Sequence, residues 1–544
     1  MRSRKFAEAT AIAVAAFTAI ATGVADAEPV ISYDSSLNEG YIPTGQLLAD
    51  SGFRPDKDGF GFQNYGNENG PTNLIPPSMR ILFGDEVCAF DQGGTCVLIP
   101  QARRWMLSQN NDMNGGHCYG MSVTSLLLHM GALQPENFGG DATADLRFPG
   151  NKAMQEMIAR QFVGQSMQAV RDGQVQGTPN QIVDKLIGVL KPGAAETYSL
   201  GFYKRDRTGG HEVTPFAIED KGDGMKSILI YDNNYLNEIR HVDVDTTRNT
   251  WTYTTAADPR HAAENYDVDA GTGTLELDPT TPAQKQHPFP HTAHHIKGNK
   301  TGASTGGSPI TVFLNGDPID HGHLLITDDH ERRIGFVGGK RVNEIPGARF
   351  VDIKANDSAY RSEPTYELPP GAQYSVTVDG TDLNKTDPTS VSIIGDAYEI
   401  SASSINLTPN SKSTIKVSGD GSKVTYNSTD AQKPDIEIGE SYDSTDYTFI
   451  ASKTAVGAGG EVSVSLPLDH NVFTVDGSKS GADEAIGVRI IRDDKSKKET
   501  REFTYDGINV AKGGTAELNF DDWDKGGKSI DLAVNGEKVR LAAN

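Results

Sequence analysis

The chain has 544 residues, of which 36% are hydrophobic and 23% are charged, and its 50 basic and 73 acidic residues give a formal net charge of -23. At roughly 100 to 200 residues per domain, this length predicts about three domains, each with its own core. The acidic balance repels phosphate backbones and anionic lipid head groups, which argues against nucleic acids and membrane surfaces as partners.

Residues 1–27 predict a secretory signal peptide. They begin with Arg2, Arg4 and Lys5, continue with an apolar stretch, and end with the small residues of Ala25-Asp26-Ala27 at a cleavage position. No later segment approaches the roughly 20 apolar residues that a membrane-spanning helix needs. We therefore expect a secreted, extracellular protein with no membrane span after signal removal.

Two of the three cysteines lie in residues 28–98, which we expect to be an irregular segment rich in Gly, Asn, Pro and Asp. Cys88 and Cys96 flank two glycines in CAFDQGGTC, so the chain can turn back and join them in an oxidising compartment. This pairing leaves Cys118 as an intermolecular link, an inert buried residue or a reactive thiol.

The helices of an α+β domain are expected in the first half of residues 99–297. Residues 118–130 are apolar on nearly every face, which indicates a buried helix that ends at Gly131. Two further helical stretches begin at Asn151 and Asn180.

The second half of residues 99–297 changes to an alternating pattern. Residues 211–220 and 225–234 predict a β-hairpin, and RHVDVD and NTWTY predict further strands. Helices followed by strands within one segment are typical of an α+β domain.

Short alternating runs separated by Gly, Asp, Asn and Pro continue to the end of the chain. A linker rich in Gly, Ser and Thr at 296–309 precedes them. This spacing indicates one or two all-β modules of sandwich type, and we favour two, at 309–400 and 401–544.

Cys118 is the candidate nucleophile. A thiol attacks a carbonyl as its thiolate, which the positive end of a helix stabilises. Cys118 stands at the start of the predicted helix, after Gly115 and Gly116, which let the backbone turn closely and keep the sulfur approachable. Its alternative role is that of a small core residue.

His211 and the end of the hairpin are the candidate partners. An imidazole takes the thiol proton, and a third group fixes the tautomer and orientation of the ring. If the hairpin is symmetric about Lys221-Gly222, His211 lies opposite Asp232, whereas a loop one residue longer places it opposite Asn233. Either side chain can reach the ring from a directly opposed position.

GGHCYGMSVTSLLL resembles the nucleophile segment of secreted bacterial papain-like cysteine peptidases, of the kind found in actinobacteria. GGHEVTPFAIEDKGDGMKSILIYDNNY is similar to their histidine-bearing strand pair. The resemblance covers about residues 85–260 and implies a papain-like domain with Cys118 as nucleophile, His211 as base and Asp232 or Asn233 as third member. It implies no cofactor and no metal.

One position departs from the papain-like pattern. These enzymes generally carry a Gln a few residues before the cysteine, and its amide stabilises the oxyanion of the tetrahedral intermediate. The sixth residue before Cys118 is Asp112, which cannot donate a hydrogen bond when ionised. Among the nearby amides we expect Asn111 to serve.

Other histidines are weaker candidates. His321 and His323 also lie at a strand start, but beyond the linker. Residues 287–295 hold four histidines in a proline-containing loop that lacks the fixed spacing of a metal site.

The sequence thus predicts a secreted thiol hydrolase, with a peptide or protein substrate and an extracellular or cell-surface partner held by the β modules. Hydrolysis and acyl transfer to an amine use the same groups, so the sequence leaves the choice open. The alternative is a binding or adhesion protein whose papain-like domain is a catalytically silent scaffold.

Overall fold

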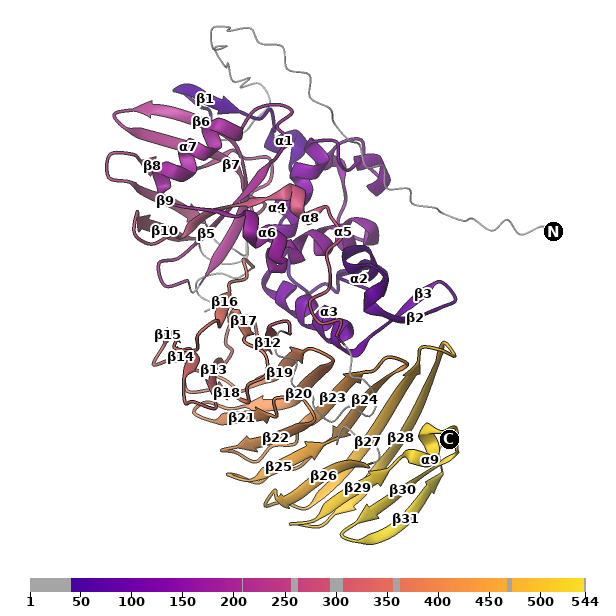
Figure 1. Cartoon of the computed structure of the whole chain (residues 1–544). Helices are drawn as coiled ribbons and strands as arrows, with labels where there is room; N and C mark the ends of the chain where they lie inside the picture. Colours follow the sequence, from indigo (N-terminus) through magenta and orange to yellow (C-terminus); the bar gives the residue numbers. More distant parts are fainter. Residues whose placement is uncertain are drawn as a thin grey trace, which may run out of the picture.

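The computed structural model describes residues 41–207, 209–255, 263–293, 307–355, 363–466 and 472–542. Figure 1 shows two parts: an α+β part up to residue 293 and an antiparallel β part from residue 307. The expected signal peptide and most of the expected linker lie outside the described residues. In the described ranges, no helix is long and apolar enough to cross a membrane.

Helix α4, the predicted helix that begins at Cys118, packs mainly against α5 and also contacts α1 and α8. All its residues through Leu128 are buried, and it ends before Gly131, whose φ of 71° suits glycine. Asn151 caps α5 by accepting from the backbone of Met154 at 3.3 Å. The helices are α1 (Pro55–Asp58), α2 (Pro76–Phe83), α3 (Pro100–Asp112), α4 (Cys118–His129), α5 (Lys152–Phe162), α6 (Gln168–Gly173), α7 (Pro179–Val189) and α8 (Thr280–Ala283).

The main sheet of this part has the order β10-β9-β8-β7-β6-β5-β11-β4, and β1 also pairs with β6. Helix α7 packs against its strands, and α4 crosses β6 and β5. The strands are β1 (Gln46–Asp50), β4 (Val175–Gln176), β5 (Tyr198–Tyr203), β6 (Gly210–Gly222), β7 (Met225–Tyr231), β8 (Arg240–Asp245), β9 (Thr250–Thr255), β10 (Glu264–Asp269) and β11 (Leu275–Pro279).

Residues 41–98, the described part of the segment before residue 99, are more ordered than the sequence suggested. Strand β1 extends the main sheet, and a hairpin joins β2 (Cys88–Gln92) to β3 (Thr95–Leu98). The predicted disulfide between Cys88 and Cys96 is confirmed. Composition alone did not predict this order, because long-range packing stabilises the short apolar stretches of the segment.

The hairpin of β6 and β7 forms as predicted, but its expected register is wrong. Asp223 and Gly224 make the turn with positive φ values of 51° and 78°, as a two-residue hairpin loop requires. Bulges then shift the pairing, and the ladder ends at Thr214 opposite Tyr231. His211 therefore has no directly opposed partner on β7.

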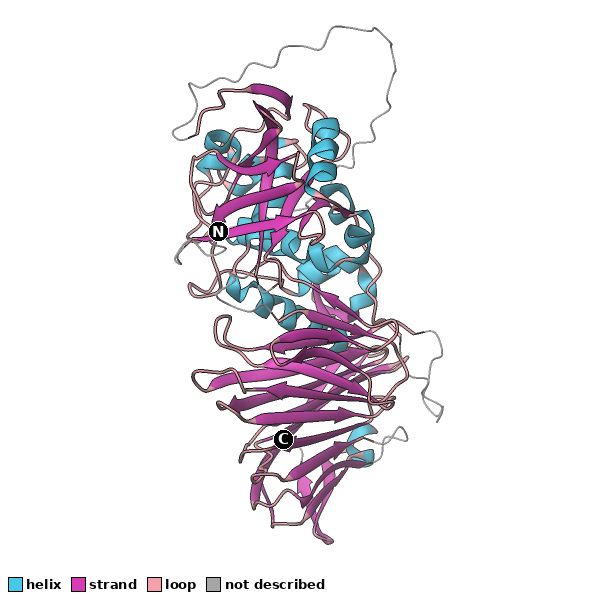
Figure 2. Cartoon of the chain, turned by 90° about the vertical axis from the view of Figure 1, so that its left-hand side faces the viewer, coloured by secondary structure: helices cyan, strands magenta, loops and turns pink. Residues whose placement is uncertain are grey.

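The β part consists of two stacked antiparallel sheets (Figures 1 and 2). One sheet has the order β16-β17-β12-β19-β20-β23-β24-β27-β28, and the other β15-β14-β13-β18-β21-β22-β25-β26-β29-β30-β31. Its first strands are β12 (Ile310–Asn315), β13 (His323–Asp328), β14 (Arg333–Val337), β15 (Lys340–Asn343), β16 (Arg349–Val351), β17 (Thr365–Leu368), β18 (Tyr374–Asp379), β19 (Asp387–Gly395), β20 (Tyr398–Leu407), β21 (Lys412–Val417) and β22 (Lys423–Ser428).

The remaining elements continue the same two sheets, with one short helix near the end. They are β23 (Asp435–Ser441), β24 (Thr445–Ser452), β25 (Glu461–Ser465), β26 (Val472–Lys479), β27 (Glu484–Asp494), β28 (Glu499–Val510), β29 (Thr515–Asn519), α9 (Asp521–Asp524), β30 (Ser529–Val534) and β31 (Glu537–Ala542). One hydrophobic core lies between the sheets and runs from Ile310 to Leu541.

The expected boundary between residues 400 and 401 falls inside β20. Both sheets continue on either side of it, and residues before and after it share one core. The two expected modules are therefore one continuous sandwich. Alternation within a strand marks its buried face but says nothing about which sheet the strand joins, so the sequence did not show this.

Helix α3 connects the two parts. It packs against β19, β20 and β23, and Arg104 forms ion pairs with Glu399 at 2.9 Å and Glu437 at 2.8 Å. The hydrophobic core around α3 also includes Val351, the last residue of β16, and Ile353 from the segment that follows. The β part thus reaches into the α+β part at the edge of its sandwich.

Candidate active site

Cys118 is the first residue of α4 and is fully buried with a free thiol. The turn before it is held by the backbone N–H of His117, which donates to the Asn64 side chain at 2.8 Å. Gly116 has a φ of 156°, and a Cβ there would lie 2.9 Å from the Asn64 amide. The glycine turn predicted before the helix is therefore sterically required.

His211 lies near the start of β6, and its Nε2 is 2.9 Å from Oδ1 of Asp232, which follows β7. Both side chains are fully buried. The hydroxyls of Tyr253 and Thr255 donate to the other carboxylate oxygen at 2.7 and 2.8 Å. The structure thus brings His211 and Asp232 together, and two hydroxyls of β9 fix the carboxylate in place.

The second ring nitrogen of His211, Nδ1, is not used by Asp232. Within the described ranges Nδ1 has no hydrogen-bond partner, and Cys118 is one of the groups that act on the ring. Burial alone lowers the pKa of His211, but Asp232 and then Cys118 outweigh burial and raise the pKa well above its ordinary value. This favours an imidazolium beside the sulfur.

The pKa of the Asp232 carboxylate shifts in the opposite direction. Burial raises the pKa of Asp232, but the His211 ring, the backbone N–H of Asn234 and the Tyr253 hydroxyl together hold it below its ordinary value. Asp232 is therefore the anion of the pair, and it holds the ring with Nδ1 pointing away from itself.

Asn233 has a different position from Asp232. Its amide nitrogen donates at 3.1 Å to the Cys118 carbonyl, to the Ser122 hydroxyl and to the Glu212 carbonyl. It thereby joins the start of α4 to β6. Of the two candidates for the third member, Asp232 contacts the ring and Asn233 positions the helix that carries the thiol.

The expected oxyanion residue finds no support in the geometry. Across the residues that the structure describes, no hydrogen bond joins the Asn111 amide to Cys118 or His211. The buried Gln109 amide donates to Asp112 at 3.0 Å, and burial raises the pKa of Asp112 well above its ordinary value. The acid form that this favours can donate a hydrogen bond, unlike the ionised form considered from the sequence.

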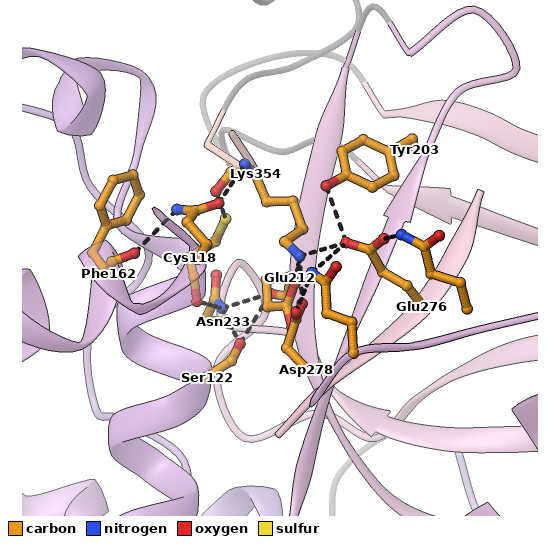
Figure 3. A network of polar contacts seen from close by, with 12 residues as sticks. Cys118, Ser122, Phe162, Tyr203, Glu212, Asn233, Glu276, Asp278 and Lys354 are labelled. Carbon is orange, nitrogen blue, oxygen red and sulfur yellow. Dashed lines mark hydrogen bonds and ion pairs between the residues drawn. The ribbon is translucent and has the colours of Figure 1, made fainter. Parts of the chain in front are cut away.

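A segment of the β part covers the sulfur, which the sequence did not suggest. The Cys118 thiol donates to the backbone carbonyl of Lys354 at 3.2 Å, and Lys354 N–H donates to Gln165 at 2.8 Å (Figure 3). Residues 352–355, here called the capping segment, follow β16. No local signal in the sequence links them to a cysteine 236 positions away.

The other candidate histidines that the structure describes lie outside this site. In the β part, His323 contacts Glu363 at 2.8 Å. These two residues and His321 form a group whose potential metal-ligand atoms lie within 4.8 Å of one another. In the histidine-rich loop, buried His291 contacts Thr311 at 3.1 Å. His294 and His295 of that loop lie outside the described residues.

The site therefore combines a thiol at a helix start, an imidazole held by a buried carboxylate, and a peptide carbonyl within hydrogen-bonding distance of the sulfur. Comparison of the chain with protein-family models, with curated proteins and with solved structures gives no match.

Proposed function

We propose that the chain is a thiol hydrolase of papain-like design that cleaves peptide or amide bonds. The observation that carries the proposal is the buried contact between His211 and Asp232 beside the free thiol of Cys118. Helix α4 and the hairpin of β6 and β7, which are distant in sequence, converge there, and a packing cysteine needs no such arrangement.

Each group has one role in the proposed reaction. Cys118 is the nucleophile, and His211 takes its proton and returns it to the leaving amine. Asp232 holds the ring and stabilises its charged form. The backbone N–H groups of the first turn of α4, which have no partner within the helix, stabilise the oxyanion. Asn233 is a positioning residue.

The compartment and partners follow from the same proposal. A disulfide between Cys88 and Cys96 persists in an oxidising compartment, so we place the protein outside the cell. Its substrate is a peptide or protein, and its β part holds a partner on the cell surface or in the medium. Its acidic charge disfavours nucleic acid.

The competing function is a silent scaffold in a binding protein. The observation in its favour is that Cys118, His211 and Asp232 are all 0% exposed beneath the capping segment. An external substrate reaches the sulfur only after this segment moves or is cut.

The test is cleavage of a mixture of synthetic peptides by the full chain, read by mass spectrometry of the new termini. Cys118→Ala and His211→Ala are expected to lower the rate at least about 1,000-fold, because each removes a member of one catalytic unit. His241→Ala, a histidine outside the site, serves as the matched control. Peptide cleavage that survives in Cys118→Ala eliminates the proposal, and a wild-type chain that cleaves nothing favours the scaffold.

A further inference from the structure

The backbone of Lys354 lies at the sulfur as a substrate would. Its carbonyl oxygen is 3.2 Å from Sγ of Cys118, and its N–H is held by Gln165. Because a C=O bond is about 1.23 Å long, the carbonyl carbon lies within about 4.4 Å of the sulfur. A shift of about 1 Å brings it to the distance of roughly 3 to 3.5 Å from which attack occurs.

The Lys354 side chain occupies a pocket of three carboxylates (Figure 3). Its ammonium lies 2.6 Å from Glu276 and 3.4 Å from Glu212, and it also forms an ion pair with Asp278. The side chain is only 1% exposed. Burying an ammonium is costly unless it is fully paired, so this pocket closely matches its occupant.

Gly201 of β5 makes room for the aliphatic part of the lysine, because a Cβ there would lie 2.8 Å from Cδ of Lys354. Gly210 of β6 makes room for the Tyr203 ring of the same pocket, from which a Cβ would lie 2.8 Å. The rings of Tyr119 and Tyr203 have their centres 5.3 and 5.8 Å from the ammonium. The walls thus fit a long, thin side chain that ends in a cation.

The charges of the pocket also favour a cation. Burial lowers the pKa of Lys354, but Asp278, Glu212 and Glu276 outweigh burial and raise the pKa well above its ordinary value. Burial raises the pKa of Glu212 to about 8, and Lys354 offsets only part of that effect. Three acids face the ammonium of Lys354. Arg207 also acts on Glu276 but is itself paired with Asp352, so the acids of the pocket favour an ammonium group as their occupant.

We propose that this pocket makes the site specific for lysine on the acyl side of the cleaved bond, and that the chain's own Lys354–Ala355 bond is its first substrate. The inference rests on the proposed function and names its substrate class. The acidic pocket holds the lysine ammonium, and the carbonyl of the same residue lies beside the sulfur.

The reaction balances with water as the only co-reactant. His211 takes the thiol proton, and the Cys118 sulfur adds to the carbonyl carbon of Lys354. The bond to the Ala355 nitrogen breaks, and that nitrogen leaves as an amine with the proton from His211. Water then hydrolyses the thioester, which leaves a carboxylate on Lys354 and restores the thiol.

The two products remain associated after the cut. Strands β12 and β13 precede Lys354, and they pair with β17, β18 and β19, which follow it. Both fragments therefore share the sheets and core of the sandwich. We expect them to elute as one species in native buffer and to separate on denaturation.

The experiment follows the intact mass of the purified full chain over time at neutral pH. We expect one product that ends at Lys354 and one that begins at Ala355, with no cleavage in Cys118→Ala. Lys354→Met is expected to slow the cut at least about 100-fold, because it leaves the buried carboxylates without their cation. The exposed Lys340→Met is the matched control and is expected to cleave at the wild-type rate.

A second variant tests the pocket while Lys354 and its three carboxylic partners are all retained. The Cβ added in Gly201→Ala would lie 2.7 Å from Oε2 of Glu212 and 2.8 Å from Cδ of Lys354, so it crowds the lysine and its pocket together, and we expect it to slow the cut at least about 10-fold. Gly188→Ala on α7, where an added Cβ meets nothing within 4 Å, is the matched control. Equal rates in these two variants overturn the assignment of the pocket.

The peptide mixture separates this inference from the proposed function. If the full chain cleaves added peptides after lysine but its own chain stays intact, self-cleavage is refuted and the hydrolase proposal stands. Cleavage of added peptides without preference for lysine refutes the specificity pocket. If neither the peptides nor the chain are cut, the proposed function fails, and the inference fails with it.

Discussion

At the residue scale, the buried pair of His211 and Asp232 makes stability depend on pH. The pKa of His211 is raised, by Asp232 and Cys118 against the effect of burial, and the pKa of Asp232 is lowered, by His211 and its hydrogen-bond donors against burial. Each shift means that folding favours the charged form of that group. The ion pair therefore stabilises the fold in the pH range where both partners are charged.

We predict that Asp232→Asn lowers the free energy of unfolding by about 3 to 5 kcal/mol between about pH 4 and pH 6.5. The histidine contribution is complete below about pH 6.5 and is lost as pH rises through the raised pKa of His211. The aspartate contribution is lost as pH falls through the lowered pKa of Asp232. Urea unfolding of both proteins across this range measures the difference. A difference that grows with rising pH contradicts the ion pair.

The residues of this pair were largely readable from the sequence. A cysteine at a helix start, a histidine on a strand and an aspartate after the next strand are local patterns, and the structure brings the three together. The hairpin register that suggested the contact between His211 and Asp232 was wrong, because β-bulges shift the pairing of β6 with β7. The contact forms nevertheless, because Asp232 lies beyond the last ladder pair, where its carboxylate turns toward the ring.

At the scale of elements, the site depends on how α4 is joined to β6 and β7. The only described hydrogen bonds of the Asn233 amide nitrogen run to Cys118, Ser122 and Glu212, and these bonds fix the helix start against the strands. Asn233, just after the end of β7, thus determines where the Cys118 sulfur lies relative to the His211 imidazole.

We predict that Asn233→Ala lowers the free energy of unfolding by about 2 to 3 kcal/mol, because buried acceptors lose their donor. Peptide cleavage is expected to fall as well, with the pH profile of the remaining activity unchanged, since Asn233 does not contact the ring. The matched control, Asn265→Ala on the exposed side of β10, is expected to change stability by less than about 0.5 kcal/mol. A shifted pH profile in Asn233→Ala would assign it a role at the imidazole instead.

At the scale of the whole molecule, the β part is a single body. Its two sheets and its core run without a break from β12 to β31, through the position where a module boundary was expected. A cut near residue 400 separates β18 from β21 and β19 from most of β20, and it removes Tyr398–Ile400 from their pairs on β23.

We predict that residues 401–544 alone do not fold, whereas residues 307–544 unfold in one cooperative transition. The shorter fragment exposes sheet edges and half of a shared core, which makes it prone to aggregate. Thermal unfolding followed by circular dichroism compares the two fragments. A cooperative transition in the shorter fragment would restore the two-module interpretation.

By itself, the sequence determined the local structure and chemistry. Hydrophobic periodicity, glycine turns and cysteine spacing predicted α4, the hairpin of β6 and β7, the disulfide and the candidate thiol, imidazole and carboxylate. These features depend on residues close together in the chain, whose spacing fixes which face is buried and where the backbone turns.

Only the tertiary structure decided the single sandwich, the capping segment and the acidic pocket of Lys354. Lys354 is 236 positions from Cys118, and its carboxylate partners come from β6 and β11. The pairing of a buried lysine with distant acids depends on how the sheets pack, and no periodicity in the sequence records it. The physical reason is that a local pattern specifies a buried face, whereas the complete fold specifies what that face meets.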